Sequence, residues 1–206
     1  AASLSQPLLI VTSSTRRSEE LCAEISSLIG KDCVVNFPAW ETLPHERLSP
    51  KADTVTARFK ALNKITDQSA KVIVCSIRAL LQPIIANNLE ESKISLVNKM
   101  ELSMADLILK LVEFGFTRSD LVERRGDFAV RGGILDLFPA DQDHPIRLDF
   151  FGEEIDDISY FGVADQRSLE KINNNVIIFP CRELLLNEKV KQNAMKLAEE
   201  FPQLKE

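Results

Sequence analysis

Six residues that follow the first apolar run stand where nucleotide-binding α/β domains keep a phosphate loop. They read Ser13-Ser14-Thr15-Arg16-Arg17-Ser18. A phosphate loop needs glycines, so that backbone N–H groups can wrap the phosphates, and a lysine that reaches them. This segment has neither, although Arg16 and Arg17 can meet an anion at a helix N-terminus. A solvated helix start is the favoured interpretation, and we expect no cofactor.

Carboxylates are frequent in the second half of the chain, and they are the ligands that a divalent-metal nuclease site would need. No nucleophile, base or lysine accompanies them at a recognisable spacing, so a solvated hairpin surface is favoured. Each of the two histidines, His45 and His144, lies beside a proline, and the four cysteines form no CxxC pair. Triad chemistry and a zinc site are therefore disfavoured. We expect no catalytic residue, no metal site and no enzymatic activity. The carboxylates are Asp127, Asp136, Asp149, Glu153, Glu154, Asp156 and Asp157.

The run Ile146–Phe151 alternates with the period of a half-buried strand, which places Ile146, Leu148 and Phe150 on a core face. Arg147, Asp149 and Phe151 fall on the opposite face, and arginine and phenylalanine are both enriched at protein interfaces. On the neighbouring strand, Arg131 precedes Gly132-Gly133, which we interpret as a bulge that re-aims a side chain. One exposed sheet face can thus show Arg131, Arg147 and Phe151. The alternative is that Phe151 packs under another element and that both arginines pair with local carboxylates.

Composition limits the partners and the compartment. The 206 residues carry a net charge of −6, so there is no global attraction to nucleic acid or to anionic lipid. The cysteines Cys22, Cys33, Cys75 and Cys181 are far apart and lie in apolar runs, which is typical of reduced thiols in a cytoplasmic protein. No apolar run approaches the roughly 18–20 residues of a membrane span.

Buried strands alternate with helices in the first half, which predicts a parallel α/β domain over residues 1–95. Strands are expected over 8–12, 34–37 and 72–75. Helices are expected over 15–29, from a cap at Asp53, and over 77–81.

From about Leu96 the pattern predicts a small α+β domain over residues 96–180. Ser103 and Asp106 open a helix that Gly115 closes. Strands are expected over 128–137, 146–151, 155–162 and 176–180. The terminal segment 181–206 is expected to be an exposed helix or the start of a third domain.

The run Arg124–Ile158 resembles the interaction domain that UvrB shares with the bacterial transcription-repair coupling factors (Mfd). Residues 40–50 (WETLPHERLSP) and 165–169 (DQRSL) resemble the coupling factors specifically. The resemblance covers residues 8–180 and implies a degenerate P-loop, RecA-like domain followed by a UvrB-type domain that binds UvrA. The UvrA-contacting positions of the family fall on Arg131, Arg147 and Phe151.

The resemblance also implies what the chain does. It is expected to be a non-catalytic docking module, part of a longer DNA translocase, that recruits UvrA to a stalled RNA polymerase. The expected contacts of the chain are with UvrA and with later domains of the same polypeptide. RNA polymerase and DNA would be reached through other domains, no membrane is involved, and a monomer is expected. The chain lacks the glycine-lysine loop and the aromatic hairpin of UvrB. The alternatives are a UvrB-type nucleotide- and DNA-binding fragment and an autoinhibitory domain that masks the UvrA site.

Overall fold

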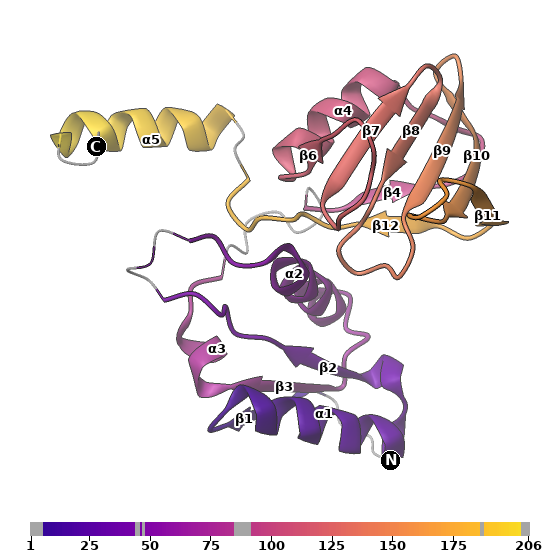
Figure 1. The fold of residues 1–206 in the computed structure, drawn as a ribbon. Coiled ribbons are helices and arrows are strands. Elements are labelled where there is room, and N and C mark those ends of the chain that lie inside the picture. Colours follow the sequence, from indigo (N-terminus) through magenta and orange to yellow (C-terminus); the bar gives the residue numbers. More distant parts are fainter. Residues whose placement is uncertain (1–5, 44–45, 47, 85–91, 186–187, 203–206) are drawn as a thin grey trace.

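A computed structural model describes residues 6–43, 46, 48–84, 92–185 and 188–202. Figure 1 shows two sheets stacked along the molecule, with several helices around the first and a single helix packed on the second. The first is a parallel sheet in the order β1-β3-β2. Its elements are β1 (Leu8–Thr12), α1 (Thr15–Ile29), the 3-10 turn Lys31–Cys33, β2 (Val34–Phe37), α2 (Ala52–Thr66), β3 (Val72–Ser76) and α3 (Ile77–Leu81).

Helices cover both faces of the parallel sheet, because its central strand is apolar on both sides. Val72 and Val74 of β3 pack toward α1, and Ile73 and Cys75 pack toward α2 and α3. All five residues of β3 are buried. The parallel α/β class is therefore confirmed for this part. Three parallel strands with helices on both faces are common to many α/β folds, so the RecA-like relationship stays a prediction.

The first strand differs from the expectation that it is buried. Leu8, Leu9 and Val11 are 47%, 49% and 42% exposed. β1 and β2 are the two edges of the sheet, but the side chains of β2 pack against α1 and α2 and are largely buried, whereas β1 is covered less. A run of apolar residues shows that a strand can be buried, but it does not show how far neighbouring elements cover it.

The second sheet is built mainly from antiparallel strands in the order β11-β10-β9-β8-β7-β6, with β5 also pairing with β10. β4 and β12 form a separate two-stranded antiparallel ribbon. The strand expected over 176–180 is therefore β12, and it pairs with β4. The elements are β4 (Ile94–Leu96), β5 (Met100–Glu101), α4 (Met104–Glu113), β6 (Thr117–Arg118), β7 (Asp127–Arg131), β8 (Ile134–Leu137), β9 (Ile146–Phe151), β10 (Glu154–Phe161), β11 (Ser168–Lys171) and β12 (Val176–Ile178).

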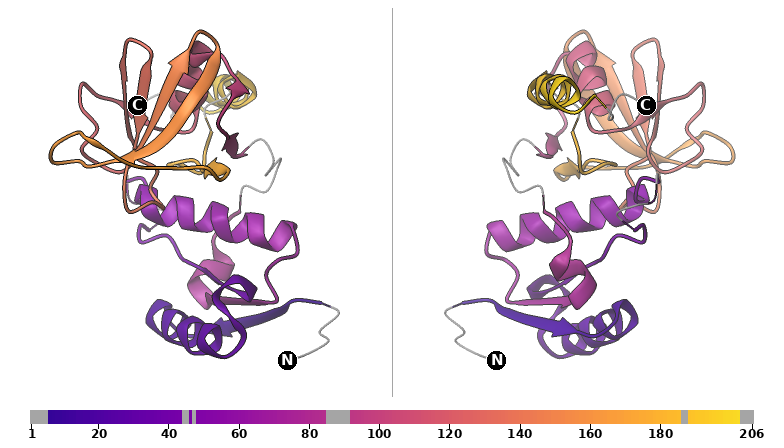
Figure 2. Two further views of the ribbon diagram at one scale, coloured as in Figure 1. Left: turned by 90° about the vertical axis from the view of Figure 1, so that its right-hand side faces the viewer. Right: turned by 90° about the vertical axis from the view of Figure 1, so that its left-hand side faces the viewer.

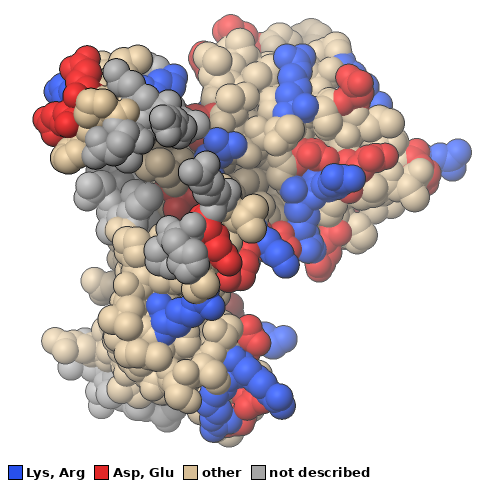
Figure 3. All heavy atoms as spheres, turned by 60° about the vertical axis from the view of Figure 1, so that its left-hand side comes forward, with Lys and Arg blue, Asp and Glu red and all other residues tan. Residues whose placement is uncertain are grey.

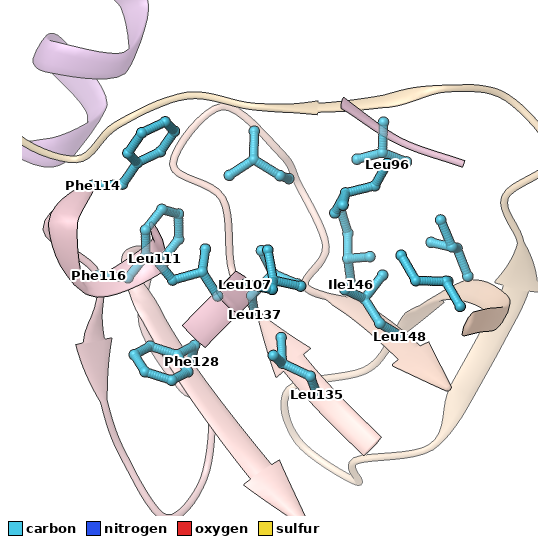
Figure 4. Close-up of a cluster of buried hydrophobic side chains, with 14 of the residues drawn as sticks. Leu96, Leu107, Leu111, Phe114, Phe116, Phe128, Leu135, Leu137, Ile146 and Leu148 are labelled. Atoms are coloured by element: carbon cyan, nitrogen blue, oxygen red, sulfur yellow. The ribbon is translucent and has the colours of Figure 1, made fainter. Parts of the chain in front are cut away.

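The inner face of this sheet packs against α4 and the β4–β12 ribbon. Figure 4 shows leucine, isoleucine and phenylalanine side chains from the helix, the ribbon and the strands meeting in one core. Ser103 caps α4 by accepting a hydrogen bond from the Asp106 N–H, and Gly115 follows the helix at φ +84°. The predicted helix start at Ser103 and the glycine end are therefore confirmed.

One expected strand is in fact two. Residues 128–137 form β7 and β8, which pair antiparallel, so that Arg131 lies opposite Ile134. Gly132-Gly133 is the two-residue turn between them, with Gly132 at φ +60°, so the bulge interpretation was wrong. A double glycine serves a tight hairpin as well as it serves a bulge, since both need backbone conformations that other residues resist.

Helix α2 lies between the two sheets in both views of Figure 2. It begins at Ala52, and Lys51 rather than Asp53 is its N-cap residue, which corrects the predicted cap. Asp53 instead pairs with Arg125 at 3.5 Å, and Lys60 pairs with Asp141 at 3.1 Å. The boundary predicted between residues 95 and 96 stays a prediction. The terminal helix α5 (Glu188–Glu200) projects away from both sheets (Figure 1).

Candidate functional site: an arginine and phenylalanine face on the second sheet

The outer face of the second sheet, opposite the core, carries the residues that sequence analysis singled out. We use "outer face" for Arg131, Asp136, Arg147 and Phe151 together. Strand pairing places Asp136 of β8 directly opposite Arg147 of β9. Because side chains alternate along a strand, both project from the same side of the sheet. Arg131 lies at the end of β7 that leads into the Gly132-Gly133 turn.

Asp136 is the centre of this face, and it is only 1% exposed. Its Oδ1 accepts a hydrogen bond from Arg147 Nε at 2.7 Å, and its Oδ2 accepts one from Arg147 Nη2 at 2.9 Å. The same Oδ2 accepts a hydrogen bond from Arg131 Nη2 at 2.6 Å. A buried carboxylate that receives two donors from one guanidinium is a strong, geometrically specific pair. The two arginines are therefore brought together by one aspartate.

Arg147 is turned into the protein more than its position on the outer face suggested. Its side chain is 11% exposed, and its Nη1 donates to Gln166 O and Ser168 Oγ, each at 3.2 Å. Its guanidinium carbon lies 4.7 Å from the centre of the Phe161 ring, a cation–π contact. Hydrogen bonding to Asp136 raises the pKa of Arg147 and burial opposes that rise. The expectation of a solvent-facing Arg147 was wrong, because β11 and the loop before it fold over this side chain.

Arg131 is more exposed than Arg147. Its side chain is 44% exposed, although it reaches the same carboxylate. A guanidinium has five N–H donors. Within the described part of the chain the hydrogen bond from Nη2 to Asp136 is the one recorded for Arg131. With 44% of the side chain exposed, Arg131 stays partly accessible to solvent.

Phe151 is 83% exposed, whereas Phe150 packs partly buried against the core. The alternation expected for this strand is therefore confirmed. Phe150 N donates to Gly133 O at 2.7 Å, so the tips of the β7–β8 and β9–β10 hairpins lie at the same end of the sheet. Arg131 and Phe151 consequently share one end of the outer face, and the packing alternative for Phe151 does not hold.

The aspartate was missed as a site residue. Sequence analysis counted Asp136 among solvated carboxylates, and the structure buries it between two arginines. A signal was available, because side chains alternate along a strand. Asp136 points to the side of the sheet opposite Leu135 and Leu137, which is the side that carries the neighbouring arginines. The strand pairing that joins them was hidden by reading β7 and β8 as one strand.

The Ser13–Ser18 segment forms the start of α1. Ser14 caps the helix by accepting a hydrogen bond from Arg17 N at 3.3 Å. Arg16 pairs with Glu20 at 2.9 Å, and Arg17 pairs with Glu24 at 3.2 Å. Both cations are therefore engaged by glutamates of their own helix.

A second charged cluster lies between the two sheets, and sequence analysis did not single it out. Arg58 of α2 is 1% exposed and forms an ion pair with Glu183. Arg58 also donates to Pro38 O at 2.8 Å and Pro83 O at 3.1 Å. Trp40 Nε1 donates to the same Glu183 carboxylate at 2.7 Å. Burial lowers the pKa of Arg58, and Glu183 acts against that effect.

A cavity of about 700 Å³ opens beside this junction. Trp40, Leu48 and Pro50 line it from the first sheet's side, and Arg125 and Cys181 line it from the second. Burial raises the pKa of the Cys181 thiol to about 12, so the thiol is neutral over the ordinary pH range. The lining is mixed in polarity and carries no arrangement of groups that indicates a particular ligand.

Charges of both signs alternate over the side of the molecule that Figure 3 shows, and neither sign gathers into a broad patch. Among the described residues, no group of three or more histidine, cysteine or acidic side chains is placed to hold a metal ion. None of the helices in the described part of the chain is long and apolar enough to cross a membrane.

Comparison with known proteins now adds to this geometry. Residues 94–184 match the family model of the UvrB interaction domain. The chain is 43% identical over 95% of its length to the transcription-repair-coupling factor of Mycobacterium tuberculosis, and it spans 16% of that protein. It is 31% identical to the factor of Escherichia coli over 81% of the chain and 14% of that protein. It is also 25% identical to the UvrABC system protein B of Lactiplantibacillus plantarum, over 95% of the chain and 31% of that protein.

Proposed function

Since the chain is a homologue of the transcription-repair-coupling factors and residues 94–184 belong to the UvrB interaction domain family, we propose that it docks the repair protein UvrA through the outer face. In the longer proteins to which it is similar, this docking would bring UvrA to RNA polymerase stalled at a lesion. The chain itself supplies a binding surface and no chemistry. Its role is therefore that of a recruitment module for nucleotide excision repair.

The observation that carries this proposal is the exposure of Phe151 at the end of the outer face that also carries Arg131. A phenylalanine that is 83% exposed forgoes the roughly 1.5–3 kcal/mol that burial of such a side chain contributes. Scattered apolar side chains occur on any surface, but phenylalanine and arginine are both enriched at protein interfaces, and here both are exposed at one end of the outer face. The arginine can meet a carboxylate or carbonyl of UvrA, and the ring can enter an apolar pocket.

The nucleotide- and DNA-binding alternative has less support. The segment before and at the start of α1 has no glycine and no lysine to hold a phosphate, and its arginines form exposed ion pairs with Glu20 and Glu24. The net charge of −6 gives no attraction to a polyanion. Autoinhibition by a later part of the polypeptide stays a prediction, and it uses the same outer face.

The test is calorimetric titration of purified UvrA with this chain and with its Phe151→Ala variant. We expect saturable binding for the unchanged chain and a loss of about thirtyfold in affinity for the variant, as for an interface anchor. Leu109→Ala on α4 is the matched control, because Leu109 is also an exposed apolar residue, at 69%. Absence of binding by the unchanged chain would reject the docking role. Equal losses in the two variants would reject the assignment of the face.

A further inference from the structure

The outer face has two arginines and one buried carboxylate, and the two arginines are used unequally. At least four N–H donors of Arg147 are engaged inside the protein, by Asp136, Gln166 and Ser168. Its guanidinium also stacks on Phe161. Little of Arg147 is left for a partner.

Arg131 differs because a single nitrogen reaches Asp136 while the rest of its side chain is 44% exposed. A free arginine side chain carries about 2 kcal/mol of rotamer entropy, which is lost when a partner fixes it. Holding the guanidinium beforehand reduces that loss at the moment of binding. The 2.6 Å contact with Asp136 is the feature that can hold it.

Asp136 also allows the two cations to lie together. The guanidinium groups converge on the same Oδ2 atom, at 2.6 Å and 2.9 Å, where like charges would otherwise repel. Arg147 gives hydrogen bonds to both oxygens of Asp136 and is also attracted by Asp149 of the same strand, so its charge is well compensated. Arg131 is the more exposed of the two cations, at 44% against 11% for Arg147.

We propose that Asp136 is a positioning residue of the docking face, which holds Arg131 ready for an acidic group of the partner while Arg147 acts as an internal strut. The inference rests on the proposed docking function. It divides the predicted trio into two contact residues, Arg131 and Phe151, and one supporting residue, Arg147. The partner surface that fits has a carboxylate opposite Arg131 and an apolar pocket for Phe151.

Two measurements on the 206-residue chain test the inference. The first uses the free chain, without UvrA, and follows the Nε–H order parameter of Arg131 by ¹⁵N relaxation. Asp136→Asn is expected to lower this order parameter toward that of a freely rotating arginine. An Arg131 side chain that stays equally ordered in Asp136→Asn would overturn the proposal, whatever UvrA does.

The second measurement is a double-mutant cycle in UvrA affinity with Arg131→Ala, Asp136→Asn and the combined variant. Each single change is expected to weaken binding by about tenfold, in line with loss of one charge-assisted hydrogen bond. The combined variant should bind about as weakly as Arg131→Ala alone, because Asp136 acts through Arg131. Multiplied losses would show that the two act separately, and the proposal would fail.

Asp157→Asn is the matched control, since it removes one carboxylate of the same sheet that pairs with Lys171 at 2.8 Å and not with an arginine. It should leave the order of Arg131 unchanged and UvrA affinity within about twofold. If Asp136→Asn does not fold, Asp136→Leu with Arg147→Met removes both members of the buried pair, a change that such pairs often tolerate. Arg131 should again become mobile. If the unchanged chain does not bind UvrA, the docking function is rejected, and the order parameter still decides the positioning role.

Discussion

Two clusters in this chain consist of arginines around a largely buried carboxylate. One lies inside, between the two sheets, and the other lies on a partly exposed face. Arg58 and Glu183 lie between the two sheets, with Arg58 1% exposed and its other donors on backbone carbonyls. Arg131, Asp136 and Arg147 lie on the outer face, where one of the two arginines is left 44% exposed. The first cluster is closed on itself. The second leaves Arg131 partly exposed, and this is the residue that the proposed docking role uses.

The number of cations that share one carboxylate distinguishes a structural role from a binding role. Where each cation has its own set of acceptors, removal of a partner should cost stability and leave binding alone. Where two cations share one acceptor, removal of the exposed cation should cost binding and leave stability nearly unchanged. Neither burial nor residue type distinguishes the two clusters, because each contains an arginine that is largely buried.

The largest effect is expected at Arg58. Arg58→Ala leaves Glu183 without its ion pair and removes the cation from between the Phe37 and Trp40 rings. Breaking a buried pair by deleting one partner typically destabilises a protein by about 3–5 kcal/mol. Urea melts should show this loss. Binding of UvrA, measured where the variant is still folded, should stay within about twofold, and a strong loss there would break the separation of roles.

The next largest effect is expected at Arg147, where the structure changes the prediction. A solvent-facing arginine would tolerate Arg147→Glu with little change in melting temperature. Instead, Arg147→Glu places a second carboxylate against buried Asp136, and we expect it to destabilise the chain by about 3 kcal/mol or more. Arg131→Ala is the comparison, and we expect its loss of stability to be smaller, because Arg131 gives a single hydrogen bond to Asp136 and is 44% exposed. Equal melting temperatures for the two variants would mean that Arg147 is not a strut.

A smaller effect is expected at Phe151, and it appears in binding. Phe151→Ala should change the free energy of unfolding by well under 1 kcal/mol and weaken UvrA binding by about 2 kcal/mol. Phe150→Ala should do the reverse, with a stability loss near the lower end of the roughly 3–5 kcal/mol typical of buried phenylalanine, because Phe150 is only partly buried. Parallel denaturation and titration of both variants measure the difference. Similar stability losses would place Phe151 in the core.

The smallest effect is kinetic and reports on the junction between the sheets. Cys181 is buried, with its N–H donating to Phe114 O at 2.8 Å, and burial raises the pKa of its thiol to about 12. At pH 8 the thiol is therefore protonated, so iodoacetamide should modify it slowly, and faster when the junction between the sheets opens. Arg58→Met should speed this modification about tenfold or more, and Arg131→Ala should leave its rate unchanged. Mass spectrometry of the Cys181 peptide follows the reaction, and equal rates in all three chains would show that the Arg58 cluster does not hold the junction.

Much of the fold followed from local patterns. The helix over Thr15–Ile29, the strand over Ile146–Phe151 and the glycine that ends α4 were all expected at or near their observed positions. Each depends on residues within one or two turns of one another, where periodicity and capping act directly. The inward and outward sides of β9 were also predictable, since alternation needs only a strand and a core.

What the sequence by itself determined about this protein is the type and place of most of its helices and strands, and the side of β9 on which Phe151 lies. Tertiary structure alone decided that β1 is an edge strand, that Gly132-Gly133 is a turn, and that Asp136 lies beneath two arginines. It also decided that Arg58 meets Glu183, which follows it by 125 residues. The physical reason is that an ion pair or a strand neighbour depends on which segments meet in space. Periodicity fixes the direction in which a side chain points, but not the group that receives it.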